Sequence, residues 1–193
     1  MNKKTTAYST LHCNGIDLLL DEPKVMGILN VTPDSFFDGG KYSTLKTQMK
    51  KAEKMIADGA SIIDLGGMSS RPGAEIISAG EELKRVLPVV KALKKKFPDV
   101  IISIDTLHAE VAHACINEGA GIINDISGGT FDKNIFAIAA KSKVPFIIMH
   151  MKGKPNTMQL NPEYKNVVSE VKMFFEKQVT SAQKKGVKQI ILD

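Results

Sequence analysis

The stretch VIISIDTLHAEVAHACINEGAGIINDIS (100–127) decides the fold class, because it contains two strands separated by one helix. Residues 100–106 and 121–127 are apolar runs rich in isoleucine, and such runs predict strands that are buried on both faces. Residues 108–119 predict a helix that ends in glycine. Parallel strands need a crossover of about a dozen residues between them, usually a helix, so this order predicts a parallel α/β sheet.

The same alternation of strand and helix continues on both sides of this stretch. We expect further strands at 25–31, 61–67, 144–151 and 188–193, and further helices at 44–59, 79–97, 133–143 and 163–186. Residues 10–20 predict a small hairpin, with Asn14-Gly15 as a type I′ turn. Pro88 lies inside the helix at 79–97 and predicts a kink or a break there.

Polar residues at the strand ends favour a barrel over a doubly wound sheet. Nearly every predicted strand finishes in one: Asn30, Asp64, Asp105, Asn124, His150 and Asp193. A (β/α)8 barrel gathers such ends at one mouth, where its active site lies. A doubly wound sheet usually carries a glycine-rich phosphate fingerprint, and none follows the first strand here.

The fold class we predict is therefore α/β, a TIM (β/α)8-type barrel of which this chain supplies about six units after an N-terminal hairpin. We expect one domain over residues 1–193, with the seventh and eighth units absent. The first and last strands would then expose unpaired backbone groups unless something covers them.

Composition excludes several classes of protein. The chain has 193 residues, 43% of them hydrophobic, and its net charge of +5 comes largely from lysine runs typical of solvated helix faces. Aromatic content is 6% without tryptophan, which argues against nucleic-acid binding. No apolar run is long enough for a membrane span, and the N-terminus does not resemble a signal peptide. Cys13 and Cys115 lie far apart, which argues against a disulfide framework or zinc knuckle and suits a cytoplasmic protein.

Three groups of residues could carry chemistry. Asn30 offers an amide oxygen that Mg²⁺ can use beside phosphate and water, although a strand-end cap would look the same. The ends of three apolar strands carry Asp105, Asn124 and Asp193. A carboxylate at such a place can accept paired N–H bonds from a heterocycle. Taken singly, each of these residues could instead be the N-cap of the helix that follows. The Ser70-Arg71 pair could bind diphosphate or carboxylate, or be an ordinary loop arginine.

The motifs that hold these residues resemble those of the dihydropteroate synthase family of the folate pathway, from about residue 24 to residue 193. They occur in the family's order and spacing: MGILNVTPDSFFDGG (26–40), IIDLGGMSSRPGAE (62–75), ISIDT (102–106), INDISGG (123–129), MHMKGKP (149–155) and ILD (191–193). The resemblance implies a transferase that joins 6-hydroxymethyl-7,8-dihydropterin diphosphate to p-aminobenzoate and releases diphosphate. It also implies a (β/α)8 barrel, Mg²⁺ as cofactor, a cytoplasmic setting, a homodimer when full length, and sulfonamides as analogues of p-aminobenzoate.

The resemblance also assigns roles to residues. It implies metal and diphosphate binding by Asn30, and pterin binding by Asp105, Asn124 and Asp193, with Met149 beside the ring. It implies a p-aminobenzoate pocket made when loops close, from Phe36, Asp38, Ser70, Arg71 and Pro72. We predict Asp38, Arg71 and Asp105 as the catalytic residues. Ser70 replaces the family's usual threonine and keeps the hydroxyl, whereas Met68 replaces a commoner glutamate, with unclear effect.

The chemistry implied is loss of diphosphate, followed by attack of the arylamine on a pterin methylene cation. The amine is already nucleophilic, so we expect catalysis by positioning and electrostatics, with Asp38 steadying positive charge. Asp64 is predicted to be structural or to support other site residues, and His150 to be a satisfied strand-end histidine. His108 and His113 are predicted to be surface or packing residues.

The sequence departs from the family's pattern in one respect, and two alternative functions remain open. The family uses a lysine after strand seven and an arginine and histidine after strand eight, and none of these follows Asp193 here, so we expect this chain alone to have little activity. A pterin-dependent methyltransferase domain would share the barrel and the ring contacts, but its chemistry needs no diphosphate or arylamine pocket. A non-catalytic pterin-binding fragment would bind pterin and ignore p-aminobenzoate.

Overall fold

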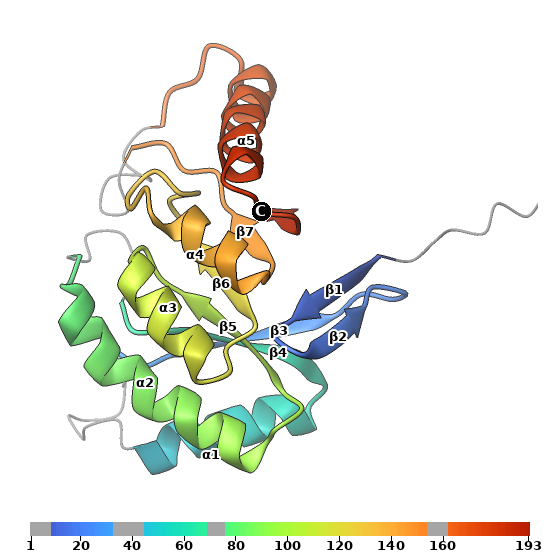
Figure 1. Ribbon diagram of the computed structural model, residues 1–193, viewed down its shortest axis with the longest axis vertical. Coiled ribbons are helices and arrows are strands. Elements are labelled where there is room, and N and C mark those ends of the chain that lie inside the picture. Colours follow the sequence, from blue (N-terminus) through green and yellow to red (C-terminus); the bar gives the residue numbers. More distant parts are fainter. Residues whose placement is uncertain (1–8, 33–44, 69–75, 154–161) are drawn as a thin grey trace, which may run out of the picture.

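The computed structural model describes residues 9–32, 45–68, 76–153 and 162–193, and within them it shows one parallel sheet flanked by helices (Figure 1). The strands of this sheet are β3 (Val25–Asn30), β4 (Ala60–Gly66), β5 (Ile101–Asp105), β6 (Ile122–Asp125), β7 (Phe146–Ile148) and β8 (Ile190–Leu192). They lie in sequence order, and each pairs in parallel with the next. A doubly wound sheet would reverse its strand order at a switch point, so this order belongs to a partial barrel.

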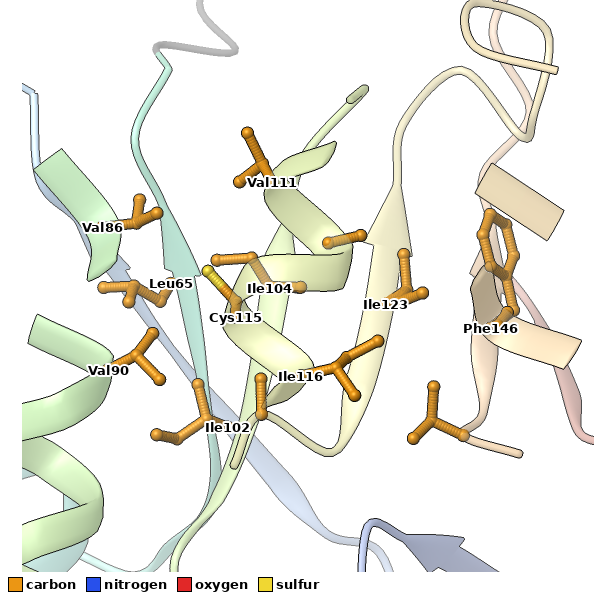
Figure 2. Packing of buried hydrophobic residues seen from close by; sticks show 14 of the residues in the cluster. Leu65, Val86, Val90, Ile102, Ile104, Val111, Cys115, Ile116, Ile123 and Phe146 are labelled. Carbon is orange, nitrogen blue, oxygen red and sulfur yellow. The ribbon is translucent and has the colours of Figure 1, made fainter. Parts of the chain in front are cut away.

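Five helices among the described residues pack on the outer face of the sheet. They are α1 (Leu45–Ala57), α2 (Ala79–Lys96), α3 (Ala109–Asn117), α4 (Ile135–Ser142) and α5 (Val167–Lys184). Strand residues of one parity, such as Leu65, Ile104 and Ile123, meet helix residues such as Val86 and Cys115 in the main core (Figure 2). Alternate side chains of a strand point to opposite faces, so the residues between them face the inside of the barrel.

The predicted hairpin is present and closes the amino-terminal end of the barrel. It consists of β1 (Thr10–Cys13) and β2 (Ile16–Leu19), and both turn residues, Asn14 and Gly15, have positive φ as a type I′ turn requires. Leu11 and Leu18 pack against inward-facing isoleucines near the start of several strands, including Ile62. The floor of the barrel is therefore apolar, and its polar residues lie toward the other end.

The helix that contains Pro88 differs from the sequence-based expectation. Helix α2 runs without interruption through Pro88, so the predicted break is wrong. Pro88 itself is exposed, while Val86 before it and Val89 and Val90 after it are buried, and their packing on the sheet keeps the helix continuous. None of the helices in the described part of the chain combines the length and apolarity needed to cross a membrane.

The outer strands of the described sheet, β3 and β8, leave apolar side chains in contact with solvent. Ile28 on β3 is 65% exposed and Leu192 on β8 is 52% exposed. Beside β8, α5 carries an open apolar groove of about 620 Å³, lined by residues that include Val168 and Phe175. These surfaces lie where further strands of a closed barrel would pack.

Candidate active site

Parallel register brings the polar strand ends into one row at the carboxyl edge of the sheet. Asn30 lies opposite Gly66, Gly66 opposite Asp105, and Asp105 opposite Asn124. A Cβ atom at Gly66 would stand 3.3 Å from Asn30 Oδ1 and 3.2 Å from Asp105 Oδ2. The amide of Asn30 and the carboxylate of Asp105 thus converge over a glycine, which leaves room for a ligand between them.

A second polar layer lies one step deeper in the barrel. Asp64 is paired in register with Ser103, and both are buried. The Asn124 amide Nδ2 donates to Asp64 Oδ2 over 3.1 Å. Asp64 Oδ1, Ser103 Oγ and Asn124 Oδ1 are buried and make no well-formed hydrogen bond, although the Ser103 hydroxyl lies close enough to Asp64 to lower the pKa of that carboxyl. Buried polar atoms are nearly always paired in native proteins, so three that lack a well-formed bond on neighbouring strands indicate a place where a bound molecule supplies the partners.

The mouth is strongly acidic. Burial raises the pKa of Asp105 well above its usual value, and the nearby carboxylates of Asp64, Glu82 and Asp125 raise it further. Burial also raises the pKa of Asp64, an effect that Ser103 and Asn124 partly offset. Asp64, Asp105 and Asp125 take part in none of the ion pairs between described residues. A ligand rich in N–H donors would relieve this excess of negative charge.

Asp193 and Met149 reach the same mouth from the last two strands. The charge of Asp193 raises the pKa of Asp64, although four strand positions separate β8 from β4. That separation would be about 19 Å across a flat sheet, so the interaction reflects the curvature of the barrel. Asp193 is exposed, and its backbone carbonyl accepts a hydrogen bond of 3.0 Å from the His150 N–H. Met149 packs with Met68 in a small apolar cluster beside the mouth.

Asp125 organises the loop after β6, a role that the sequence reading did not assign. Its Oδ1 accepts from the Ser127 N–H over 2.7 Å, and its Oδ2 accepts from the Gly129 N–H over 2.8 Å. Both glycines of this loop, Gly128 and Gly129, have positive φ. A carboxylate that accepts two backbone donors fixes the loop beside Asn124.

The histidines have different environments. His150 packs against Phe174 with ring centroids 5.0 Å apart, and its role as a satisfied strand-end histidine stays a prediction. His113 is exposed and bonds Asn117, which agrees with a surface role. His108 does more than the sequence indicates: it precedes α3, it is largely buried, and its Nε2 lies 3.0 Å from the Ile77 carbonyl, to which it donates.

Some predicted site residues fall outside the described part of the chain. These are Phe36, Asp38, Ser70, Arg71 and Pro72. Among the described residues, no three histidine, cysteine or acidic side chains form a cluster suited to a metal ion. Asn30 is exposed at the mouth with its Oδ1 near Asp105, and it could serve as a single oxygen ligand to a cation that is held mainly by phosphate and water.

The fold and the site together define a (β/α)-barrel protein whose ligand-binding end is lined by carboxylates and amides. The chain belongs to the family of pterin binding enzymes, whose model matches residues 26–193. This match confirms the resemblance recognised in the sequence.

Individual relatives are also similar to this chain. A dihydropteroate synthase of a Synechocystis strain is 50% identical over 171 residues, which are 88% of this chain and 59% of that protein. The solved dihydropteroate synthase of Xanthomonas albilineans with 4-aminobenzoic acid has a TM-score of 0.88 and 37% identity, covering 96% of this chain and 66% of that one. The Yersinia pestis dihydropteroate synthase with a sulfonamide drug has a TM-score of 0.88 and 41% identity, covering 96% and 67%. This chain thus spans about three fifths of the first relative and two thirds of the two solved chains.

Proposed function

We propose that the mouth of this barrel binds the pterin ring of a dihydropteroate synthase reaction. The observation that carries the proposal is the set of buried atoms without a well-formed hydrogen bond, Asp64 Oδ1, Ser103 Oγ and Asn124 Oδ1, beside the Asp105 carboxylate. A pterin has an amino group and ring N–H groups on one edge and acceptors beside them. Asp105 would accept the N–H groups, and Asn124 can both donate and accept.

The reaction we propose joins 6-hydroxymethyl-7,8-dihydropterin diphosphate to p-aminobenzoate. The carbon–oxygen bond to diphosphate breaks, and its electron pair leaves with diphosphate. The lone pair of the amine then forms the new carbon–nitrogen bond, and the nitrogen loses one proton. The names of the relatives and the 4-aminobenzoic acid in the Xanthomonas structure support this assignment. The sulfonamide in the Yersinia structure supports competition by sulfonamides at the same place.

The described residues would contribute binding, orientation and charge to this reaction. Asp105 and Asn124 hold the ring by its edge, while Asp64 supports Asn124 from below through their hydrogen bond. When ionised, the carboxylates at the mouth would favour the cation that forms as diphosphate departs. Met149, just after β7, and Asp193, just after β8, would complete the ring site, as the resemblance implies.

The remaining site roles rest on the sequence motifs. We propose that Phe36, Asp38, Ser70, Arg71 and Pro72 form the p-aminobenzoate pocket, with Asp38 and Arg71 catalytic beside Asp105. We propose Mg²⁺ as the cofactor, with Asn30 as its protein ligand. When bound, the ion would neutralise charge on the diphosphate.

The setting of the protein is also a proposal. We propose a single pterin-binding domain over residues 1–193, in a cytoplasmic enzyme that is a homodimer when full length. The free, buried thiols of Cys13 and Cys115 support a reducing compartment. The exposed side chain of Met173 on α5, which lies outside the groove beside β8, supports an association surface, which analytical ultracentrifugation would test.

Isothermal titration calorimetry with 6-hydroxymethylpterin tests the proposed function. We expect the wild-type chain to bind, and Asn124→Leu to bind about tenfold or more weakly, since it leaves ring groups unpaired. His113→Ala, on the exposed face of α3, is the matched control and should bind like wild type. Equal affinity of Asn124→Leu and wild type would refute the ring site.

A coupled diphosphate-release assay with both substrates tests the reaction. A pterin-dependent methyltransferase or a simple pterin-binding module would bind the pterin, yet p-aminobenzoate would change neither its affinity nor the release of diphosphate. The same assay measures how much turnover this chain has.

A further inference from the structure

A fully buried carboxylate lies on the sheet-facing side of α2, where an apolar side chain would be usual. Glu82 has 0% of its surface exposed and shares its helix face with Val86, Val89 and Val90. Burial raises its pKa to about 7, which the Thr106 hydrogen bond and the charge of Arg85 partly oppose. Glutamate is rarely so buried without a partner that needs it, so its contacts identify what it does.

The first contact of Glu82 holds the residue that follows Asp105. The Thr106 hydroxyl donates to Glu82 Oε2 over 3.0 Å. The same hydroxyl accepts from the His108 N–H over 3.1 Å, so its single proton points to the carboxylate. Thr106 is 1% exposed, and its own N–H donates to the Asn124 carbonyl over 3.0 Å. Through Thr106, Glu82 thereby fixes the backbone that follows Asp105 and its hydrogen bond to Asn124, the two residues assigned to the pterin edge.

The second contact of Glu82 is with the end of β4. A Cβ atom at Gly67 would lie 2.8 Å from Glu82 Cγ, so the backbone after β4 rests directly on the glutamate side chain. One turn further along α2, Arg85 Nη1 donates to the Gly67 carbonyl over 3.0 Å. Gly67 follows Gly66, the glycine over which Asn30 and Asp105 converge.

We propose that Glu82 is a positioning residue for pterin binding: it joins the carboxyl ends of β4 and β5 and so sets where Asp105 stands relative to Gly66 and Asn124. This inference rests on the proposed function, because pterin is the ligand whose edge Asp105 would meet. Glu82 itself lies behind the mouth and acts through Thr106 and the Gly67 backbone. An acceptor oxygen at this position is the essential feature, so glutamine can replace glutamate.

The test is titration of 6-hydroxymethylpterin into five purified variants and wild type, each first shown to be folded by circular dichroism. Glu82→Ala and Thr106→Val each remove the hydrogen bond, and we expect each to weaken pterin affinity about tenfold. Glu82→Gln keeps an acceptor, Thr106→Ser keeps the hydroxyl, and both should stay within about twofold of wild type. Glu110→Ala removes an exposed carboxylate in the first turn of α3 and is the matched control.

A double variant separates positioning from general loss of packing. Glu82→Ala with Thr106→Val should bind about as weakly as either single variant, because both remove the same link. Hydrogen exchange of the His108 amide should accelerate in these variants and not in the conservative ones. If Glu82→Ala does not fold, Thr106→Val and Thr106→Ser alone decide the question.

The outcomes are distinguishable. Pterin binding by wild type with equal affinity in Glu82→Ala and Thr106→Val would overturn the positioning role and leave the proposed function standing. Additive losses in the double variant would also overturn it. Absence of pterin binding by wild type would refute the proposed function, and the positioning role with it.

Discussion

Replacing Glu82 by glutamine should change the stability of the protein in a way that depends on pH. Glu82 is buried on α2, and its pKa is raised from 4.5 to about 7, mainly by burial. The folded protein therefore binds a proton at Glu82 more tightly than the unfolded chain does. The stability that comes from the neutral form is fully present below pH 4.5 and is lost as the pH rises to about 7.

The size of the effect follows from the same shift. Each pKa unit is worth about 1.4 kcal/mol, so the ionised carboxylate costs about 3 kcal/mol of folding free energy at pH 8. Glutamine carries no charge, yet its amide oxygen can still accept the hydrogen bond from Thr106. We expect Glu82→Gln to be more stable than wild type by about 3 kcal/mol at pH 8, and by about 1 kcal/mol or less at pH 5.

Urea unfolding followed by circular dichroism at pH 5, 6, 7 and 8 measures this difference. Glu110→Gln, which removes an exposed carboxylate in the first turn of α3, is the control for the loss of one charge. A stability difference between Glu82→Gln and wild type that stays constant from pH 5 to pH 8 would refute the reasoning. It would mean that burial does not disfavour the ionised form of Glu82 in the folded protein.

Three further changes test the fold and the buried thiols. Leu65→Ala should cost about 2–5 kcal/mol in urea unfolding, because Leu65 is fully buried between the sheet and the helices (Figure 2), and a loss below about 1 kcal/mol would contradict that packing. Gly121→Ala should cost about 1–3 kcal/mol, since a Cβ there would lie 2.8 Å from the Cys13 carbonyl oxygen of the hairpin; unchanged stability would show that the hairpin does not close the barrel floor. Burial raises the pKa of Cys13 to about 11 and of Cys115 to about 12, so iodoacetamide at pH 8 should label neither until urea unfolds the chain, whereas labelling of the native protein would contradict their burial.

Much of the fold could be predicted because strand pattern and polar strand ends are local features of the sequence. Successive side chains of a strand face opposite sides of the sheet, so Ile104 faces outward and Asp105 faces inward. Parallel pairing then aligns Asp105 with Asn124 and Gly66. The break expected at Pro88 did not occur, because burial on both sides of the proline outweighs one missing hydrogen bond.

Other features depend on tertiary contacts that no local pattern reveals. Asp125 was part of a recognised motif, yet its role in holding the Gly129 N–H appears only in three dimensions. Glu82 resembles an ordinary acidic residue in the first turn of a helix, like Glu81 beside it. One signal was available: Glu82 precedes Val86, Val89 and Val90 at helical spacing, which places its carboxylate on the buried stripe.

A structure of this chain with a bound pterin would test the central claim most directly. We expect the N–H edge of the ring to lie within hydrogen-bond distance of the Asp105 carboxylate and the Asn124 amide, with the Oδ1 atom of Asp64 close by. A pterin bound elsewhere, for example in the cleft beside Lys133 and Lys177, with Asp105 and Asn124 left without contact to it, would contradict the account.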